Sequence, residues 1–171
     1  MIGGDRMSEI ANYYAPIYSS YMKDYLNRKT IILVECGILR GTGLAIWSDL
    51  FPRGRIIGLD IDLDNIHNNM SNLKNSGAFK NNNLELYEFD QFQDNVEKFK
   101  CILKGDKISI FIDDGVHADE AIIKTMLSVH PFLSDYFLYI IEDNKHVHKK
   151  IRKIFPKFNV KDYDALTVIT P

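Results

Sequence analysis

Short apolar runs alternate along this chain with longer segments in which apolar residues recur at helical spacing. The runs are rich in β-branched and aromatic residues, as is typical of strands buried in a sheet, and lie at 31–34, 55–59, 84–89, 107–112 and 136–141. The intervening segments predict helices at 44–50, 65–76, 93–103 and 118–133. A basic helix is expected at 145–155, followed by closing strands at 158–163 and 166–170.

This alternation predicts an α/β fold with a doubly wound, Rossmann-like sheet. We expect seven strands, mostly parallel, with helices on both faces and an antiparallel strand pair at the C-terminal end. The 171 residues are predicted to form a single domain, 1–171, with a helical lead-in at 1–29 and an α/β core at 30–171. The lead-in is rich in tyrosine, and its predicted helix at 8–27 should break or kink at Pro16. It either packs across the sheet edge or brings a tyrosine over the substrate.

The first strand leads into a glycine-rich turn. Its pattern, E-x-G-x-x-x-G-x-G, comprises Glu35, Gly37, Gly41 and Gly43, and Asp60 ends the second strand. In doubly wound sheets this corner binds the nucleoside part of a cofactor. The spacing differs from the dinucleotide pattern G-x-G-x-x-G and resembles motif I of class I S-adenosylmethionine (SAM) methyltransferases. Asp60 would then accept the ribose hydroxyls; the alternative is that the glycines only form a tight turn.

Further candidates for the cofactor site follow the third and fourth strands. Asp90 and Gln91 come directly after the strand at 84–89, and Asp113 ends the fourth. An acid after the third strand of a SAM fold commonly meets the adenine amino group. Asp90 is therefore predicted to bind adenine, unless it serves only as a strand-end turn.

Three carboxylates are expected at the mouth of the sheet. Asp114 follows the fourth strand, and Glu142 and Asp143 follow the fifth. Neighbouring strands lie about 4.8 Å apart, so these groups would repel one another unless a cation lay between them. Carboxylate oxygens suit Mg²⁺. Because successive strand residues point to opposite faces, Glu142 and Asp143 can both reach one ion only if the chain turns there. Solvated strand-end acids are the alternative.

His117 lies three residues beyond Asp114, after a Gly115 turn. Its ordinary pKa lets it accept a proton at neutral pH, so it is a candidate general base for a hydroxyl nucleophile. Asp114 would assist catalysis through the metal. The alternative is a histidine beside a helix N-terminus with no chemical role. The run KHVHKKIRK at 145–153 is read as a solvated helix face, or as a binding site for a phosphate or sugar nucleotide.

Composition narrows the function classes. The formal net charge is −2, which argues against binding nucleic acid through overall charge. Cys36 and Cys101 have no metal or redox spacing, which suits a reducing compartment. The N-terminus has no apolar signal core, and no run is long enough to span a bilayer. We therefore expect a cytoplasmic protein without membrane association.

Four blocks carry a family resemblance: VECGILRGTGLAIWSDLFPRGRIIGLDID, FDQFQD, FIDDGVH and YIIEDN. They resemble the metal-dependent sugar O-methyltransferases of macrolide biosynthesis and their cephalosporin-hydroxylase-like relatives. That resemblance implies SAM as cofactor, Mg²⁺ held by Asp114, Glu142 and Asp143, and His117 as base. Val116 replaces the family's serine, and Ser134 and Asp135 stand where a glycine pair usually precedes the fifth strand.

The resemblance predicts a SAM-dependent, Mg²⁺-assisted O-methyltransferase acting on a hydroxyl of a sugar or small natural product. We expect no extra N-terminal domain or long lid, so the acceptor site is open, completed by a partner subunit, or built for something small or polymeric. Family analogy indicates dimers or larger assemblies. A nucleic-acid methyltransferase is less favoured, because DDGV stands where a [D/N]-P-P-[Y/F] motif is usual. A non-catalytic SAM-fold binding module is the third alternative.

Overall fold

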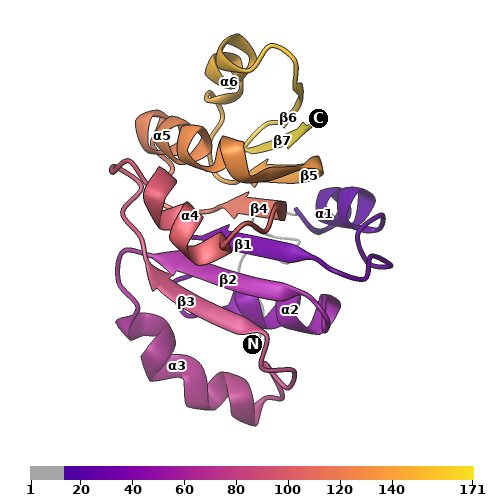
Figure 1. The fold of residues 1–171 in the computed structure, drawn as a ribbon, viewed down its shortest axis with the longest axis vertical. Helices are drawn as coiled ribbons and strands as arrows, with labels where there is room; N and C mark the ends of the chain where they lie inside the picture. Colours follow the sequence, from indigo (N-terminus) through magenta and orange to yellow (C-terminus); the bar gives the residue numbers. More distant parts are fainter. Residues whose placement is uncertain (1–13) are drawn as a thin grey trace.

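The computed structural model describes residues 14–171. It contains one seven-stranded sheet with the strand order β3-β2-β1-β4-β5-β7-β6 (Figure 1). The first five strands pair in parallel, and β7 runs antiparallel to both β5 and β6. Their bounds are β1 Ile32–Cys36, β2 Arg55–Asp60, β3 Leu84–Glu88, β4 Ile108–Asp113, β5 Leu133–Ile141, β6 Asn159–Tyr163 and β7 Leu166–Thr170. The predicted α/β fold class is confirmed.

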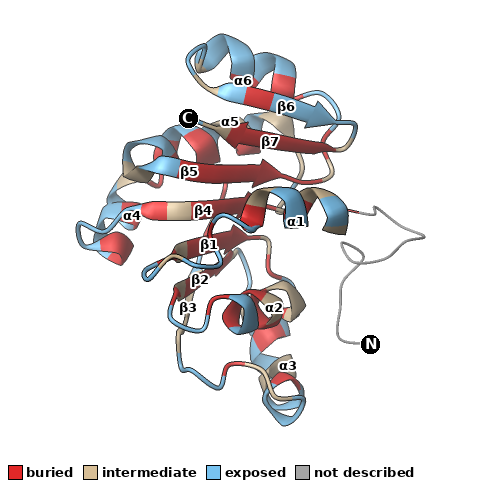
Figure 2. Ribbon diagram, turned by 90° about the vertical axis from the view of Figure 1, so that its right-hand side faces the viewer, coloured by how far each residue is buried: buried red, intermediate tan, exposed pale blue. Residues whose placement is uncertain are grey.

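Helices cover both faces of the sheet. On one side lie α1, α2 and α3, and on the other lie α4, α5 and α6, as Figures 1 and 2 show. Their bounds are α1 Ala15–Met22, α2 Thr42–Leu50, α3 Asp64–Asn75, α4 Val96–Leu103, α5 Asp119–Val129 and α6 His148–Ile154. In the part of the chain that the structure describes, no helix is both long and apolar enough to cross a membrane.

The central strands are buried on both faces because their side chains alternate between the two helical layers. Leu33 of β1 packs with the α1–α3 layer, whereas Val34 packs with the α4–α6 layer. In β4, Ile110 and Phe111 divide in the same way. This explains why the parallel strands read as continuous apolar runs rather than alternating ones.

Two expectations about helices need correction. The predicted helix at 118–133 ends earlier, because Pro131 cannot continue it: α5 stops at Val129, and a 3₁₀ turn, η2 His130–Phe132, leads into β5. Pro16 does not break or kink a helix within the described residues. It lies in the first turn of α1, where backbone N–H groups have no partner within the helix, so the N–H that proline lacks costs no hydrogen bond. The part of the predicted lead-in helix before residue 14 lies outside the described residues.

The parallel strands end together at one edge of the sheet, and backbone hydrogen bonds extend their pairing beyond the last strand residues. The Gly37 N–H donates to the Leu59 carbonyl at 2.8 Å, and the Asp114 N–H donates to the Cys36 carbonyl at 2.8 Å. The Glu142 N–H donates to Asp113 at 2.9 Å. The loops after β1, β4 and β5 are therefore held against one another, at the position where open α/β sheets bind ligands.

Candidate active site

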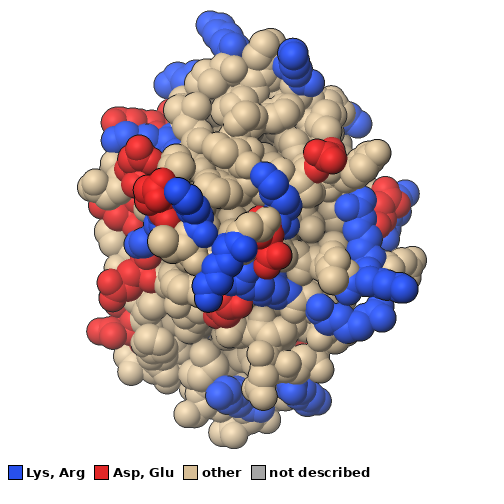
Figure 3. Space-filling view, viewed as in Figure 1, with Lys and Arg blue, Asp and Glu red and all other residues tan. Residues whose placement is uncertain are grey.

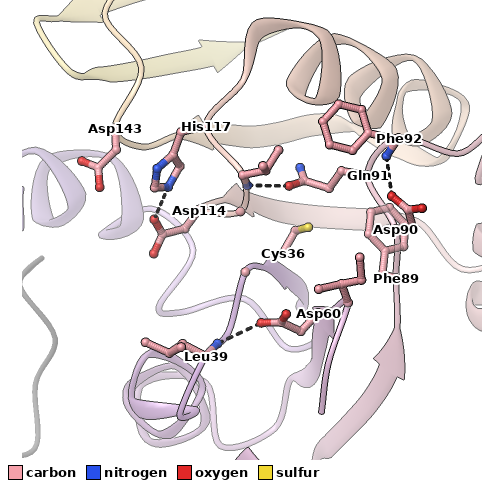
Figure 4. A pocket seen from close by; sticks show the side chains of 14 residues that line it. Cys36, Leu39, Asp60, Phe89, Asp90, Gln91, Phe92, Asp114, His117 and Asp143 are labelled. Carbon is pink, nitrogen blue, oxygen red and sulfur yellow. Dashed lines mark hydrogen bonds and ion pairs between the residues drawn. The ribbon is translucent and has the colours of Figure 1, made fainter. Parts of the chain in front are cut away.

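A cavity of about 530 Å³ opens at the carboxyl ends of the parallel strands. This volume is within the usual range for small-molecule sites. In Figure 4, Asp114, His117 and Asp143 lie together at one end, Asp90 and Phe92 lie at the other, and Cys36 lies between them. The cavity is lined by Cys36, Gly37, Leu39, Asp60, Ile61, Phe89, Asp90, Gln91, Phe92, Asp114, Gly115, Val116, His117 and Asp143.

Gly37 brings the β1–α2 loop into close contact with the loop after β4. Its φ is +84°, and a Cβ there would lie 2.0 Å from the Asp114 carbonyl oxygen and 2.6 Å from the Gly115 Cα. Any side chain would therefore collide with backbone as well as adopt an unfavourable conformation. Glycine at this position lets one wall of the cavity approach the other.

Asp60 fixes the glycine-rich loop and also faces the cavity. Its Oδ2 accepts the backbone N–H groups of Ile38 at 2.9 Å and Leu39 at 3.0 Å. Its side chain lines the cavity beside Leu39 (Figure 4). The carboxylate thus has a structural task in addition to the cofactor contact that the sequence predicts, and a carboxylate has enough lone pairs for both.

Gln91 and Asp113 belong to a buried hydrogen-bond network beside the cavity. The Gln91 amide donates to Asp113 Oδ1 at 2.8 Å and to Thr125 at 3.1 Å, and its oxygen accepts the Val116 N–H at 2.8 Å. The Tyr139 hydroxyl donates to Asp113 Oδ2 at 3.2 Å. Burial raises the pKa of Asp113 to about 6, although the hydrogen bonds from Gln91 and Tyr139 oppose that rise.

These hydrogen bonds bear on the roles of Asp113 and Gln91, which the sequence predicts to contact the cofactor. Asp113 is buried and does not line the cavity, so the structure gives it a supporting place rather than a ligand contact. Gln91 lines the cavity, but its amide is occupied by protein partners. Asp90 lines the cavity, where its predicted contact with adenine stays a prediction, and its Oδ1 accepts the Phe92 N–H at 2.8 Å (Figure 4).

Three other predicted cofactor residues lie outside the cavity lining. Glu35 is buried in the α1–α3 layer, where its Oε2 accepts the Trp47 indole N–H at 3.1 Å. Gly41 has φ +76° and precedes α2, and a Cβ there would lie 2.5 Å from Ile66. Gly43 lies in the first turn of α2. These residues shape the loop and the helix start, and their predicted contacts with the cofactor stay a prediction.

Asp114, His117 and Asp143 form a compact group. One ligand atom from each lies within 4.8 Å of the others, and His117 Nε2 lies 3.2 Å from Asp114 Oδ1. Both His117 and Asp143 have left-handed backbones, with φ of +56° and +55°. Non-glycine residues in this region are uncommon and concentrate at functional sites.

His117 is positioned from two directions. The hydrogen bond with Asp114 raises the pKa of His117, an effect that burial partly opposes. Asn144 Nδ2 donates to the His117 carbonyl at 2.9 Å and to Asp119 Oδ1 at 2.8 Å. Asn144 follows the acid pair in the YIIEDN block, and its position there was the only signal in the sequence that it belongs to the site.

Glu142 does not join this group, so the predicted metal ligand set of Asp114, Glu142 and Asp143 stays a prediction of which the structure brings two members together. It is buried on the α1 side of the sheet, and its Oε1 accepts the Tyr18 hydroxyl. Asp143 points into the cavity, and its Oδ1 accepts the Tyr14 hydroxyl at 2.7 Å. Burial, together with the hydrogen bond to Asp143, raises the pKa of Tyr14, so this hydroxyl keeps its proton. Glu142 is therefore buried beside α1, whereas Asp143, whose φ is +55°, lines the cavity.

Apolar side chains at the cavity rim were also missed from the sequence. Leu39, Ile61, Phe92 and Val116 all line the cavity and remain exposed. Ile61 and Phe92 come directly after the strand-end residues Asp60 and Gln91, and that position was the available signal. Such side chains provide flat apolar contact for a ligand whose polar groups meet the neighbouring acids.

The basic run at 145–153 is largely engaged by the protein itself. Lys145 contacts Asp164 at 2.8 Å, Lys150 contacts Asp119 at 2.8 Å, and Arg152 donates to the Val160 carbonyl at 2.9 Å. On the face shown in Figure 3, basic side chains form separate groups with acidic side chains beside or between them. These observations agree with a solvated helix face better than with a phosphate-binding surface.

The strand order is that of the class I SAM-dependent methyltransferase fold. The cavity lies at the glycine-rich turn and at Asp60, the last residue of β2. The chain is 27% identical over 139 residues to mycinamicin VI 2''-O-methyltransferase of Micromonospora griseorubida, an alignment that covers 77% of this chain and 31% of that protein. A comparison with models of protein families finds no match.

Solved structures agree on the fold. The MycE methyltransferase from the mycinamycin pathway, in complex with Mg and S-adenosylhomocysteine (SAH), superposes with a TM-score of 0.75 at 18% identity, over 96% of this chain and 50% of that one. Fibrillarin of Aeropyrum pernix with natively bound SAM gives a TM-score of 0.62 at 18% identity, over 93% of this chain and 74% of that one. The chain thus spans about a third to a half of the length of its mycinamicin-pathway relatives.

Proposed function

We propose that this chain is a SAM-dependent, metal-assisted O-methyltransferase that acts on a hydroxyl of a sugar or other small molecule. One observation carries the proposal: a single cavity joins the glycine-rich turn and Asp60 at one side to Asp114, His117 and Asp143 at the other. A methyl donor and a hydroxyl acceptor must meet between two such groups of residues.

The donor set fits a hard divalent ion. Asp114 and Asp143 offer two carboxylates, which is the number that Mg²⁺ commonly takes from a protein. When bound, such an ion would lower the pKa of an acceptor hydroxyl. The MycE structures contain Mg, and one of them also contains mycinamycin VI. We therefore propose Asp114 and Asp143 as the residues that hold the ion, and we omit Glu142.

The remaining chemistry falls to residues of this chain. Gly37 and the loop that Asp60 holds allow close approach of the cofactor, and the exposed rim of Ile61 and Phe92 contacts its flat apolar part. His117 accepts the proton of the acceptor hydroxyl as the oxygen attacks the methyl group. Asp114 orients the imidazole by hydrogen bonding and stabilises its protonated form.

Substitution at His117 separates catalysis from binding. We expect His117→Gln to reduce methyl transfer from labelled SAM to a panel of sugars and small alcohols by on the order of 10²- to 10⁴-fold. SAH affinity should remain unchanged, because the imidazole lies at the far end of the cavity from Asp90 and Phe92. His130→Gln is the matched control, since His130 packs on Phe155 and Phe158 away from the cavity.

The outcomes discriminate between the proposals. An unchanged transfer rate in His117→Gln would contradict the assigned base. Wild-type protein that binds SAH but methylates no acceptor would favour a binding module instead. A nucleic-acid methyltransferase, the alternative activity class, requires salt-dependent binding to RNA or DNA. The self-paired basic run and the formal net charge of −2 argue against that outcome.

A further inference from the structure

Helix α1 connects to the acid pair after β5 through two tyrosines one turn apart. Tyr14, at the N-cap of α1, donates to Asp143 Oδ1 at 2.7 Å, and Tyr18 donates to Glu142 Oε1. Residues at i and i+4 lie on the same face of a helix. One helical face therefore contacts both carboxylates, although only one of them faces the cavity.

We propose that Tyr14 is a positioning residue that orients the Asp143 carboxylate for metal binding, with Tyr18 anchoring α1 in the register that makes this contact. The inference rests on the proposed function, because it assumes that Asp143 is a metal ligand. It adds a residue and an element to the site that the cavity lining does not include.

Asp143 needs such support because its conformation is unfavourable. Its φ of +55° is a left-handed conformation, which is uncommon for a non-glycine residue. It lies in the short connection between β5 and α6, where little regular structure fixes its side chain. A hydroxyl donated to one carboxylate oxygen restricts rotation of the group and leaves acceptor positions for an ion. Such outer partners of metal ligands commonly tune affinity.

Tyr18 is well placed to hold α1 in position. Its ring stacks on Trp47 with centroids 5.5 Å apart, and Trp47 in turn donates to the buried Glu35. Tyr18 is itself buried, as are Glu142 and Trp47. These contacts join α1 to α2, to β1 and to the end of β5. Tyr14 therefore donates to Asp143 from a helix whose position is held by three other elements.

Metal titration of single-hydroxyl variants tests the proposal. We would titrate Mg²⁺ into full-length, metal-stripped protein by calorimetry and compare wild type with Tyr14→Phe. We expect Tyr14→Phe to raise the Kd for Mg²⁺ by on the order of 10-fold, with SAH affinity unchanged. Tyr21→Phe is the matched control on the same helix: its hydroxyl meets the Tyr163 hydroxyl at 2.8 Å, away from the acids, and its Mg²⁺ affinity should equal that of wild type.

Two results would overturn the inference. One is equal Mg²⁺ affinity in wild type and Tyr14→Phe. The other is an equal loss of affinity in Tyr14→Phe and Tyr21→Phe, which would indicate a general loosening of α1. Thermal unfolding of all three proteins verifies that they fold, and Asp143→Asn gives the affinity expected when the ligand itself is lost. A wild type that binds no Mg²⁺ would instead refute the metal part of the proposed function, so the two failures are distinguishable.

Discussion

At Gly37 the loop after β1 lies against the backbone that follows β4, and the cavity depends on this contact. We expect Gly37→Ala to abolish measurable SAH binding. It should also lower the free energy of unfolding by several times the cost of the left-handed backbone alone, which is roughly 1–2 kcal/mol. The added methyl group would have to displace the Asp114 carbonyl, which lies 2.0 Å from the ideal Cβ position. Calorimetry with SAH and urea denaturation measure the two effects.

Gly105 provides the matched control for that substitution. Its φ is +99°, but a Cβ there meets nothing within 4 Å. Gly105→Ala should therefore show the backbone effect without the steric one, and SAH should bind normally. Equal losses of stability in the two variants would argue that the close approach at Gly37 is unimportant.

The protonation of His117 makes stability depend on pH in the metal-free protein. The hydrogen bond to Asp114 raises the pKa of His117 above 6.5, so the folded state favours the protonated imidazole. This contribution is fully present below the unfolded pKa and is lost as pH rises through the folded one. The difference in unfolding free energy between wild type and His117→Gln should therefore shrink as pH rises through the raised pKa of His117. Urea denaturation in chelator measures it, and a difference independent of pH would contradict the account.

Sequence alternation anticipated part of the acidic group and missed the rest. The strand ends predicted that Asp114, Glu142 and Asp143 would come together, on the condition that the chain turns so that Glu142 and Asp143 both reach one ion. The direction of that turn depends on the left-handed φ of Asp143, which no local residue preference announces. Tyr14 was visible only as one of many tyrosines, because its partner lies 129 residues away.

Among the elements, strands were easier to predict than helix ends. Buried strands such as β4 are apolar along their whole length, so they can be recognised from their own residues. The end of α5 depends instead on Pro131, which lies two residues beyond the last helical residue, Val129. The lead-in was predicted to cover the sheet edge or to approach the substrate. Within the described residues, α1 packs on the sheet and its first tyrosine reaches the Asp143 side chain.

A partly buried ion pair joins β2 to the edge strand β3. Arg55 donates to both oxygens of Glu85, at 2.5 and 2.8 Å, and this bonding lowers the pKa of Glu85 below 4.5. Because the folded pKa is lowered, its contribution is present above the unfolded pKa and is lost as pH falls through the folded one. Glu85→Gln should lower stability by about 1 kcal/mol at pH 7.

That deficit should disappear below the folded pKa of Glu85, where wild type is also uncharged at this position. Urea denaturation at neutral and acidic pH measures the change. Glu88→Gln, at the exposed end of the same strand, serves as control and should match wild type at both pH values. A deficit that persists in acid would show that Glu85 acts through packing rather than through its charge.

At the scale of the whole molecule, the chain places the predicted cofactor corner and the acidic group on one sheet edge, which gives the fold its proposed chemistry. The fold class could be predicted because alternating strands and helices leave few possible topologies. The acceptor could not, because its recognition depends on side chains around the cavity rather than on periodicity. The chain also spans only 31% of its mycinamicin-pathway relative, so that protein's acceptor does not transfer directly.

Calorimetric titration of SAH into metal-stripped protein, repeated with Mg²⁺ present, tests the central claim most directly. We predict SAH binding in both conditions, abolished by Gly37→Ala, together with separate Mg²⁺ binding that Asp143→Asn removes. Absence of SAH binding in both conditions would contradict the methyltransferase account and leave the cavity as a site for a different ligand.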